Sequence, residues 1–241
     1  MDIDLLGRKN FTRDEITSAI EECPSLEVPE DGIQFDRGSI TADPIAEDKE
    51  HPGWRLRFRG RLGNARFVLQ IDCGFGDVII PGPVEIEYPT LLDLPGPEIF
   101  SYTIESTLAE KYQSMIVLDL ANSRMKDFYD LWTLALGSRF NGQKLTSAIK
   151  ATFNRRNTTI PREIPLAFTA AFYDNRTKQL QWRAFLRKGR FGIENLELQQ
   201  VTSKLEDFLM PPTLALAERR SFHGDWLPGG PWQADGVKEK R

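Results

Sequence analysis

Apolar and polar residues alternate along residues 55 to 72, on either side of a Gly63-Asn64 pair. A period of two predicts β-strands, and Gly-Asn between two such runs predicts a hairpin with a two-residue turn. If that turn sets the register, Arg55 lies opposite Asp72. One face of the hairpin is then apolar. The other face carries Asp72 together with five arginines: Arg55, Arg57, Arg59, Arg61 and Arg66.

The polar face of this hairpin has two interpretations that the pattern leaves open. An antiparallel sheet commonly leaves one polar face in water, so the arginines need no further role. Alternatively, the face binds a ligand, because it lies beside the Gly-Phe-Gly-Asp segment at residues 74 to 77. Glycines at such a position allow a close approach of the backbone.

From residue 101 the apolar period becomes that of a helix, and Lys111 falls inside the apolar stripe. The stripe is formed by Ile104, Leu108 and Met115. Lysine is rarely buried without a partner. The side chain of Lys111 therefore either extends along the helix to water or meets an anion in a cleft, and we favour the anion.

A second helix is predicted over residues 123 to 136. Its expected core side consists of Met125, Phe128, Trp132 and Leu136. Lys126, Asp127 and Asp130 are expected together on the opposite side, with Arg124 near the edge. A solvated face with salt bridges is the common meaning of such a pattern. The lysine in the stripe of the preceding helix favours a functional face instead.

Composition is that of a folded globular protein of one or two domains, with 241 residues, 40% hydrophobic and 27% charged. The sequence shows neither a run of about 20 apolar residues nor a signal peptide, so we expect a cytoplasmic protein without a membrane partner. Two cysteines and two histidines at scattered positions make neither a disulfide framework nor a zinc pattern. A bound metal would be held by carboxylates, which suit Mg²⁺ or Mn²⁺.

The net charge of −4 conceals an uneven distribution. Residues 1 to 123 hold 11 Lys and Arg against 23 Asp and Glu, residues 124 to 190 hold 14 against 4, and residues 191 to 241 hold 6 against 8. A middle segment with a net charge of +10 suits a phosphate-rich partner such as nucleic acid. It equally suits an acidic protein or the acidic remainder of the chain, and the charge alone leaves these open.

The first residues supply candidate metal ligands. Asp2 and Asp4 are two positions apart, so on a strand both side chains point to one face and can share one or two divalent cations. A third acid from a neighbouring strand would complete a metal-binding triad for nucleotidyl transfer. Asp72 is the candidate for this third acid.

Four segments occur in the order and approximate spacing of a known family. They are Asp-Ile-Asp-Leu-Leu at 2 to 6, Gln-Ile-Asp-Cys-Gly-Phe-Gly-Asp at 70 to 77, Tyr-Thr-Ile-Glu-Ser-Thr-Leu-Ala-Glu-Lys at 102 to 111, and Asn-Ser-Arg-Met-Lys-Asp-Phe-Tyr-Asp-Leu at 122 to 131. Together they resemble the nucleotidyltransferase toxins of the AbiEii/AbiGii family, which belong to type IV toxin-antitoxin and abortive-infection systems that act in phage defence. The last two segments are the more specific, and the resemblance covers roughly residues 1 to 210.

The resemblance implies an α+β fold, with a polymerase-β-like nucleotidyltransferase core followed by a helical C-terminal region. It implies that Asp2, Asp4 and Asp72 hold Mg²⁺ or Mn²⁺ and that Lys111 contacts the triphosphate of an NTP. Asp127 would support catalysis, with the nucleotide-binding residues Arg124, Lys126 and Asp130 around it. The implied partners are an RNA acceptor such as the tRNA 3′ end and a winged-helix antitoxin.

The resemblance also implies a Gly-Ser turn about ten residues before the two aspartates, and this chain starts at those aspartates. We therefore expect the segment to be missing, either because the start codon is assigned too late and the true protein is longer, or because this is a truncated copy. The alternative function is then a catalytically inactive, truncated member of the fold that binds an antitoxin or RNA.

Three regions are expected along the chain. Residues 1–100 form the nucleotidyltransferase-like α/β core, which contains a helix at 12 to 22 capped by Thr12. Residues 101–210 form a helical domain that completes the nucleotide site. Within it, a basic cluster either lines an RNA groove or faces water: Arg183, Arg187, Lys188 and Arg190. Residues 211–241 are rich in Pro and Gly and are expected to form a flexible tail.

Overall fold

The structure is a computed structural model that describes residues 2–23, 32–45, 53–91, 93, 95–189, 193 and 195–233, with Asp2 described by its backbone alone. Of the residues singled out above, Arg190 lies outside this description. The chain divides into two compact units, residues 1–77 and residues 78–241, called here the N-terminal and C-terminal units. This division comes earlier than the expected boundary at residue 100, because the strands that follow residue 77 pair with each other and not with the first sheet.

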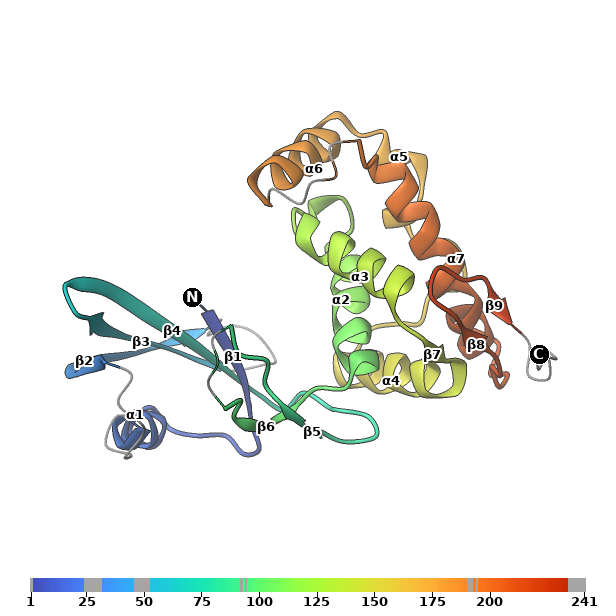
Figure 1. The fold of residues 1–241 in the computed structure, drawn as a ribbon. Helices are drawn as coiled ribbons and strands as arrows, with labels where there is room; N and C mark the ends of the chain where they lie inside the picture. Colours follow the sequence, from blue (N-terminus) through green and yellow to red (C-terminus); the bar gives the residue numbers. More distant parts are fainter. Residues whose placement is uncertain are drawn as a thin grey trace. The chain divides into compact units, whose positions relative to one another are not determined.

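The N-terminal unit is built on one four-stranded sheet with the strand order β1-β4-β3-β2 (Figure 1). The strands are β1 (Asp2–Gly7), β2 (Ile33–Ile45), β3 (Gly53–Leu62) and β4 (Ala65–Phe75). Strands β3 and β4 form the predicted hairpin, in which Leu62 pairs with Ala65 and Arg55 pairs with Asp72. Gly63 lies in this turn with a φ of 55°. Glycine adopts this left-handed conformation without the strain that a side chain would cause. The predicted register is thus confirmed.

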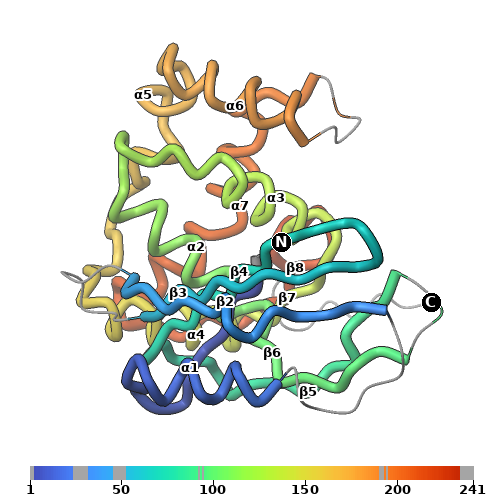
Figure 2. The backbone as a smooth tube through the Cα atoms, turned by 90° about the vertical axis from the view of Figure 1, so that its left-hand side faces the viewer, coloured from blue at the N-terminus to red at the C-terminus, as the bar shows by residue number. Residues whose placement is uncertain are grey.

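One face of this sheet is covered by helix α1 (Arg13–Glu22), which runs along the strands in Figure 2. Ile16 and Ile20 of the helix share a core with Leu56, Phe58 and other apolar residues of the hairpin. The helix starts where predicted, because the Thr12 hydroxyl accepts a hydrogen bond from the Glu15 amide while Glu15 accepts one from the Thr12 amide. The opposite face carries the polar residues of the hairpin.

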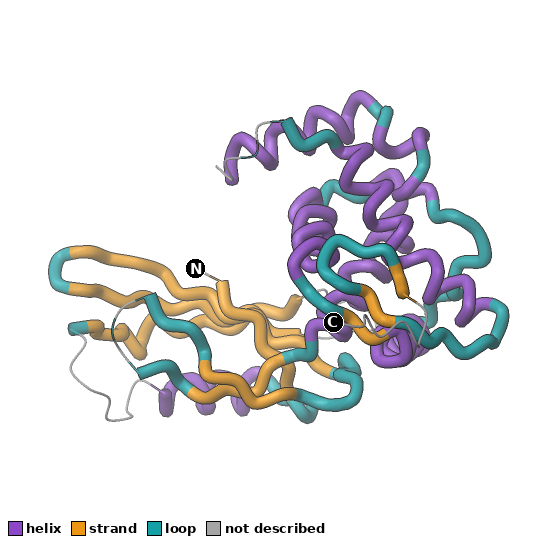
Figure 3. The backbone as a smooth tube through the Cα atoms, turned by 45° about the vertical axis from the view of Figure 1, so that its right-hand side comes forward, coloured by secondary structure: helices purple, strands orange, loops and turns teal. Residues whose placement is uncertain are grey.

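The C-terminal unit is mostly helical, whereas the N-terminal unit is mostly strand (Figure 3). It begins with a small two-stranded sheet of β5 (Val84–Glu87) and β6 (Glu98–Ser101). The helices that follow are α2 (Ile104–Leu118), α3 (Met125–Gly137), α4 (Gly142–Arg155), α5 (Ala170–Tyr173), α6 (Arg176–Gly189) and α7 (Leu198–Ala217). Two 3-10 turns lie between them, Asp119–Ala121 and Leu166–Phe168. The predicted α+β class is confirmed.

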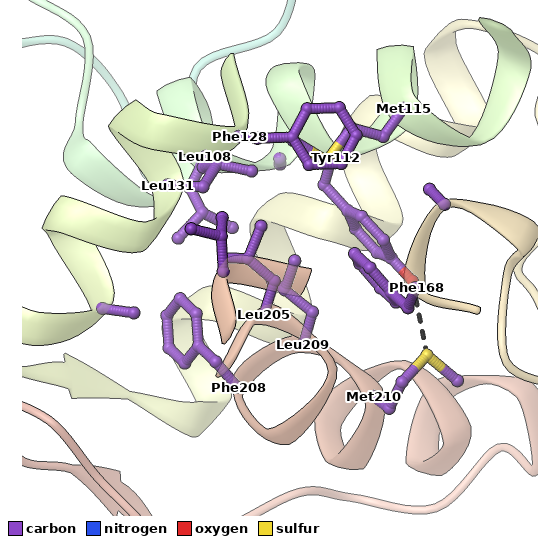
Figure 4. Packing of buried hydrophobic residues seen from close by; sticks show 14 of the residues in the cluster. Leu108, Tyr112, Met115, Phe128, Leu131, Phe168, Leu205, Phe208, Leu209 and Met210 are labelled. Carbon is purple, nitrogen blue, oxygen red and sulfur yellow. Dashed lines mark hydrogen bonds between the residues drawn. The ribbon is translucent and has the colours of Figure 1, made fainter. Parts of the chain in front are cut away.

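The core of the C-terminal unit is formed where α2, α3 and α4 pack on α7 (Figure 4). Tyr112 of α2 is fully buried and stacks on Phe168, and Phe208 of α7 packs against Phe140. Leu108 and Met115 are fully buried, as the apolar stripe predicted. None of the helices in the described ranges combines the length and apolar character needed to cross a bilayer.

Helix α3 buries Met125 and Phe128 as predicted, but the second half of its buried stripe differs from the prediction. Leu131 and Ala135 are buried, while Leu136 is 38% exposed and Trp132 is only partly covered. Asp127, which was expected on the solvent side, is 4% exposed. The reason is tertiary, because α3 packs against α2 as well as α7, and α2 presents a lysine to Asp127.

The expected flexible tail is instead structured over residues 211 to 233. Helix α7 continues through Pro211 and Pro212 to Ala217. Proline cannot donate to the carbonyl one turn earlier, yet the carbonyl of Phe208 accepts a hydrogen bond from Trp232 Nε1 at 2.8 Å. The end of the chain therefore supplies a donor where Pro212 lacks one.

The same end of the chain closes a small sheet of β7 (Phe140–Asn141), β8 (Asp225–Trp226) and β9 (Trp232–Gln233). Trp226 of β8 is fully buried, and its Nε1 donates to the carbonyl of Ala135 at 2.7 Å. Long-range packing of two tryptophans thus overrides the turn-rich composition. Residues 234–241 lie outside the described residues.

Burial raises the pKa of Tyr112 to about 12, and we predict a stability loss at alkaline pH from this residue. The folded state keeps the phenolic proton while an unfolded chain releases it near pH 10. Stability is therefore unaffected below pH 10 and falls as pH rises from 10 to about 12. The loss is about 2–3 kcal/mol by linkage. In a Tyr112→Phe variant, urea unfolding across this pH range should show a shallower decline than in the wild type. Equal declines would contradict the assignment.

Candidate nucleotide and metal site

Lys111 lies on the face of α2 that meets α3, as its place in the apolar stripe implied. Its Nζ donates to Asp127 Oδ1 and to Asp130 Oδ2, each at 2.8 Å. Its side chain is 21% exposed. The lysine therefore does meet anions, and these are carboxylates of the neighbouring helix.

Helix α3 surrounds these carboxylates with two further cations. Arg124 Nε lies 3.0 Å from Asp127 Oδ2, and Lys126 Nζ lies 2.6 Å from Asp130 Oδ2. The spacings of three and four residues place each pair on one side of the helix. We call Lys111, Arg124, Lys126, Asp127 and Asp130 the lysine-aspartate cluster. All five were predicted from the sequence to share one site, and the structure brings them together.

The lysine-aspartate cluster has the electrostatics of an anion site. Three cations face two carboxylates, so one positive charge is in excess. The side chains of Arg124 and Lys126 are 58% and 71% exposed, so their remaining N–H donors are accessible. Arginine and lysine donors of this kind bind phosphate oxygens.

The protonation of Lys111 is controlled by its two partners. Burial lowers the pKa of the amine, but hydrogen bonds and charges from Asp127 and Asp130 outweigh burial, and the net shift is upward. The amine is therefore a stable cation at neutral pH. It suits the binding of a phosphate group and does not suit the role of a general base.

The candidate metal ligands lie in the N-terminal unit, on β1 and β4. These strands are parallel, and Asp4 pairs with Asp72 while Asp2 pairs with Gln70. Paired residues of neighbouring strands point to the same face and lie about 5 Å apart. The structure thus brings Asp4 and Asp72 together; the side chain of Asp2 is outside the described residues.

Asp72 is already held by an arginine of the hairpin. Arg55 Nε donates to Asp72 Oδ1 at 2.8 Å and Arg55 Nη2 donates to Oδ2 at 2.6 Å. This answers the question of the polar face in part, because the arginines of β3 bind side chains of the same sheet. Arg57 contacts Gln70 and Asp43, Arg59 contacts Asp36, and Arg61 contacts Gln34.

Asp4 and Asp72 fit a divalent cation in chemistry and placement. Both are oxygen donors on one sheet face, and a carboxylate held by arginine keeps lone pairs for a cation. Within the described part of the chain, no three His, Cys, Asp or Glu side chains form a group that could hold a metal ion. The pair therefore needs a further ligand, from water, from the substrate or from Asp2. The lysine-aspartate cluster belongs to the C-terminal unit.

One residue near the lysine-aspartate cluster was missed by the sequence interpretation. Lys178 of α6 is 4% exposed and contacts the chain where α3 begins. The sequence does contain a sign that Lys178 is buried. Lys178 lies four residues before Trp182, which is buried, and therefore shares the same face of the helix.

A cation-rich cluster that suits phosphate and paired aspartates that suit a divalent cation are each compatible with the nucleotidyltransferase class of proteins. Residues 1–209 match a family model described as nucleotidyl transferase AbiEii toxin of a type IV toxin-antitoxin system, and the chain belongs to this family. The family confirms the predicted nucleotidyltransferase class and toxin character and implies an NTP substrate and an antitoxin partner.

Other comparisons add no functional argument. A search of curated proteins gave no match. Among solved structures, the chain is similar to JHP933 from Helicobacter pylori, with 15% sequence identity and a TM-score of 0.41. That similarity covers 90% of this chain and 77% of the other.

Proposed function

We propose that this protein transfers a nucleotide from an NTP to an RNA acceptor, such as the 3′ end of a tRNA, with Mg²⁺ or Mn²⁺. The observation that carries the proposal is Lys111, an amine held as a cation between Asp127 and Asp130 with accessible donors beside it. Such a group neutralises the charge that builds up on a triphosphate during phosphoryl transfer.

Each set of residues has a distinct task in the proposed reaction. Asp2, Asp4 and Asp72 would hold the cation, and Arg55 orients Asp72 through both of its oxygens. The bound cation would neutralise phosphate charge and favour ionisation of the attacking hydroxyl. Lys111, Arg124 and Lys126 bind phosphate oxygens, while Asp127 and Asp130 orient Lys111.

An RNA acceptor is supported by charge on α6. Arg183 and Arg187 are exposed, are one helical turn apart, and have no ion-pair partner among the described residues. They line a hollow of about 980 Å³ that also includes Trp182 and Tyr173. Exposed arginines beside such a hollow suit a nucleic-acid strand, because they can neutralise its phosphates. The protein partner proposed is a winged-helix antitoxin.

The function is tested by incubating the purified protein with total RNA, Mg²⁺ and each radiolabelled NTP in turn. Label in a tRNA-sized band with one NTP would support the proposal and identify the donor. Label in no RNA, with RNA binding retained in a gel-shift assay, would instead favour a non-catalytic RNA-binding protein.

The acceptor site is tested by an Arg183→Ala/Arg187→Ala variant. We expect RNA affinity to fall about tenfold and the slope of log affinity against log salt to drop by about 1 to 2, since two phosphate contacts are lost. NTP binding should be unchanged. The matched control is Lys144→Ala/Lys150→Ala, which removes the same charge from the exposed face of α4. Equal losses in both variants would show that only net charge matters.

A further inference from the structure

Lys178 is a buried cation that the proposed reaction does not use. It is 4% exposed, and its Nζ donates to the main-chain carbonyl of Asn122 at 2.7 Å and to Gln181 Oε1 at 3.3 Å. Within the described residues it has no carboxylate partner. Burial lowers the pKa of its amine. A lysine buried against neutral groups is costly to the fold, so its placement calls for a reason.

The carbonyl that Lys178 contacts belongs to the turn that leads into the lysine-aspartate cluster. Asn122 is fully buried and lies between the 3-10 turn at Asp119–Ala121 and α3. Its side-chain Oδ1 accepts a hydrogen bond from the Arg124 amide at 2.8 Å. Arg124 is the N-cap of α3 and supplies no side-chain capping bond. The start of the helix therefore depends on Asn122, and Asn122 is held by Lys178.

Lys178 also has an indirect link to α3, through the ring of Phe172 in α5. Its Nζ lies 5.6 Å from the ring centroid of Phe172, and Phe172 stacks on Phe128 with centroids 5.1 Å apart. Phe128 directly follows Asp127 in α3. The ammonium of Lys178 thus contacts the Asn122 turn directly and reaches α3 indirectly, through the stacked rings of Phe172 and Phe128.

We propose that Lys178 is a positioning residue for the nucleotide site: from α6 it holds the Asn122 turn and thereby sets the placement of Arg124. This inference rests on the proposed function of Arg124. The competing explanation is purely structural, because a lysine that binds a carbonyl near a helix end also stabilises a fold.

The test is a double-mutant cycle between Lys178→Met and Arg124→Ala. Methionine keeps most of the apolar stem and removes the ammonium. Binding of ATP, CTP, GTP and UTP, each with Mg²⁺, is measured by calorimetry on wild type, both single variants and the double variant. If Lys178 acts through Arg124, Lys178→Met weakens binding of the accepted NTP about fivefold to tenfold in the wild-type background and by less than twofold in the Arg124→Ala background.

The outcomes separate this inference from the proposed function. Additive losses, or no loss in Lys178→Met, would overturn the positioning role, since a general loss of stability does not depend on Arg124. An Arg124→Ala variant that binds every NTP normally would instead overturn the proposed role of Arg124. Lys150→Met on the exposed face of α4 is the control, with unchanged binding expected.

A second variant keeps the test decisive if Lys178→Met does not fold. Asn122→Ala removes the acceptor of the Arg124 amide while leaving the main-chain carbonyl for Lys178. We expect weaker NTP binding in the same fivefold to tenfold range, again lost in the Arg124→Ala background. Full NTP binding by folded Asn122→Ala would contradict the proposed route.

Discussion

Replacing Lys111 with methionine is expected to lower nucleotide transfer by about a hundredfold to a thousandfold, the range seen when a preorganised donor is removed from a transition state. The substitution removes the ammonium that lies 2.8 Å from both Asp127 and Asp130. Without the Lys111 ammonium between them, the two carboxylates would place uncompensated negative charge beside the triphosphate. Transfer is measured in single turnover with saturating RNA and the accepted NTP.

The same substitution has a structural cost that the experiment must separate. Asp127 is 4% exposed and, among the described residues, would keep Arg124 as its one charged partner, so stability should fall by about 1–3 kcal/mol. Circular dichroism at the assay temperature shows whether Lys111→Met remains folded. The control is Lys150→Met, a lysine on the exposed face of α4 that should retain full activity. A folded Lys111→Met protein with wild-type transfer would disprove the role of the amine.

Local sequence was sufficient to predict the β3-β4 hairpin and the unusual position of Lys111. Gly63-Asn64 sets the register of β3 and β4 through a tight turn, so Arg55 could be placed opposite Asp72 before any tertiary contact was known. Lys111 was recognised because a charged side chain inside an apolar stripe conflicts with burial. Both signals depend on residues close together in the chain.

The features that the sequence interpretation missed depend on distant residues. Helical periodicity placed Asp127 in solvent, and Lys111 on another helix decides its burial. The composition after residue 210 predicted a flexible tail, whereas Trp226 and Trp232 bond to Ala135 and Phe208 far back in the chain. Such contacts leave no periodic pattern, because each is a single side chain meeting one carbonyl.

The candidate metal ligands depend on both local and long-range contacts. The spacing of Asp2 and Asp4 implies one strand face, and Asp72 is a candidate third acid from the sequence, but the sequence does not predict the direction and register of the pairing between their strands. The parallel pairing of β1 with β4 brings Asp4 beside Asp72, although nearly the whole N-terminal unit separates the two residues in sequence. The pairing of Arg55 with Asp72 follows from the predicted register, but the bidentate contact between their side chains is seen only in the structure.

Asp4→Asn should strongly reduce metal-dependent transfer while leaving the fold intact. Asparagine keeps the shape of the side chain and one oxygen, but it lacks the charge that a divalent cation requires from a small set of ligands. Asp4 is exposed, and no bond of its side chain to another described residue is lost. We expect transfer to fall by about a hundredfold to a thousandfold and the Mn²⁺ concentration for half-maximal transfer to rise.

Two measurements isolate the metal from the acceptor and the nucleotide. Mn²⁺ binding, followed by calorimetry or by electron paramagnetic resonance, should weaken in Asp4→Asn without any NTP present. Asp14→Asn on α1 changes the same charge in the same unit and should bind Mn²⁺ as the wild type does. If Asp4→Asn retains both Mn²⁺ binding and transfer, the paired strands do not hold the catalytic metal. Loss of transfer with normal Mn²⁺ binding would instead place Asp4 on the substrate, because its carboxylate would then act without being a metal ligand.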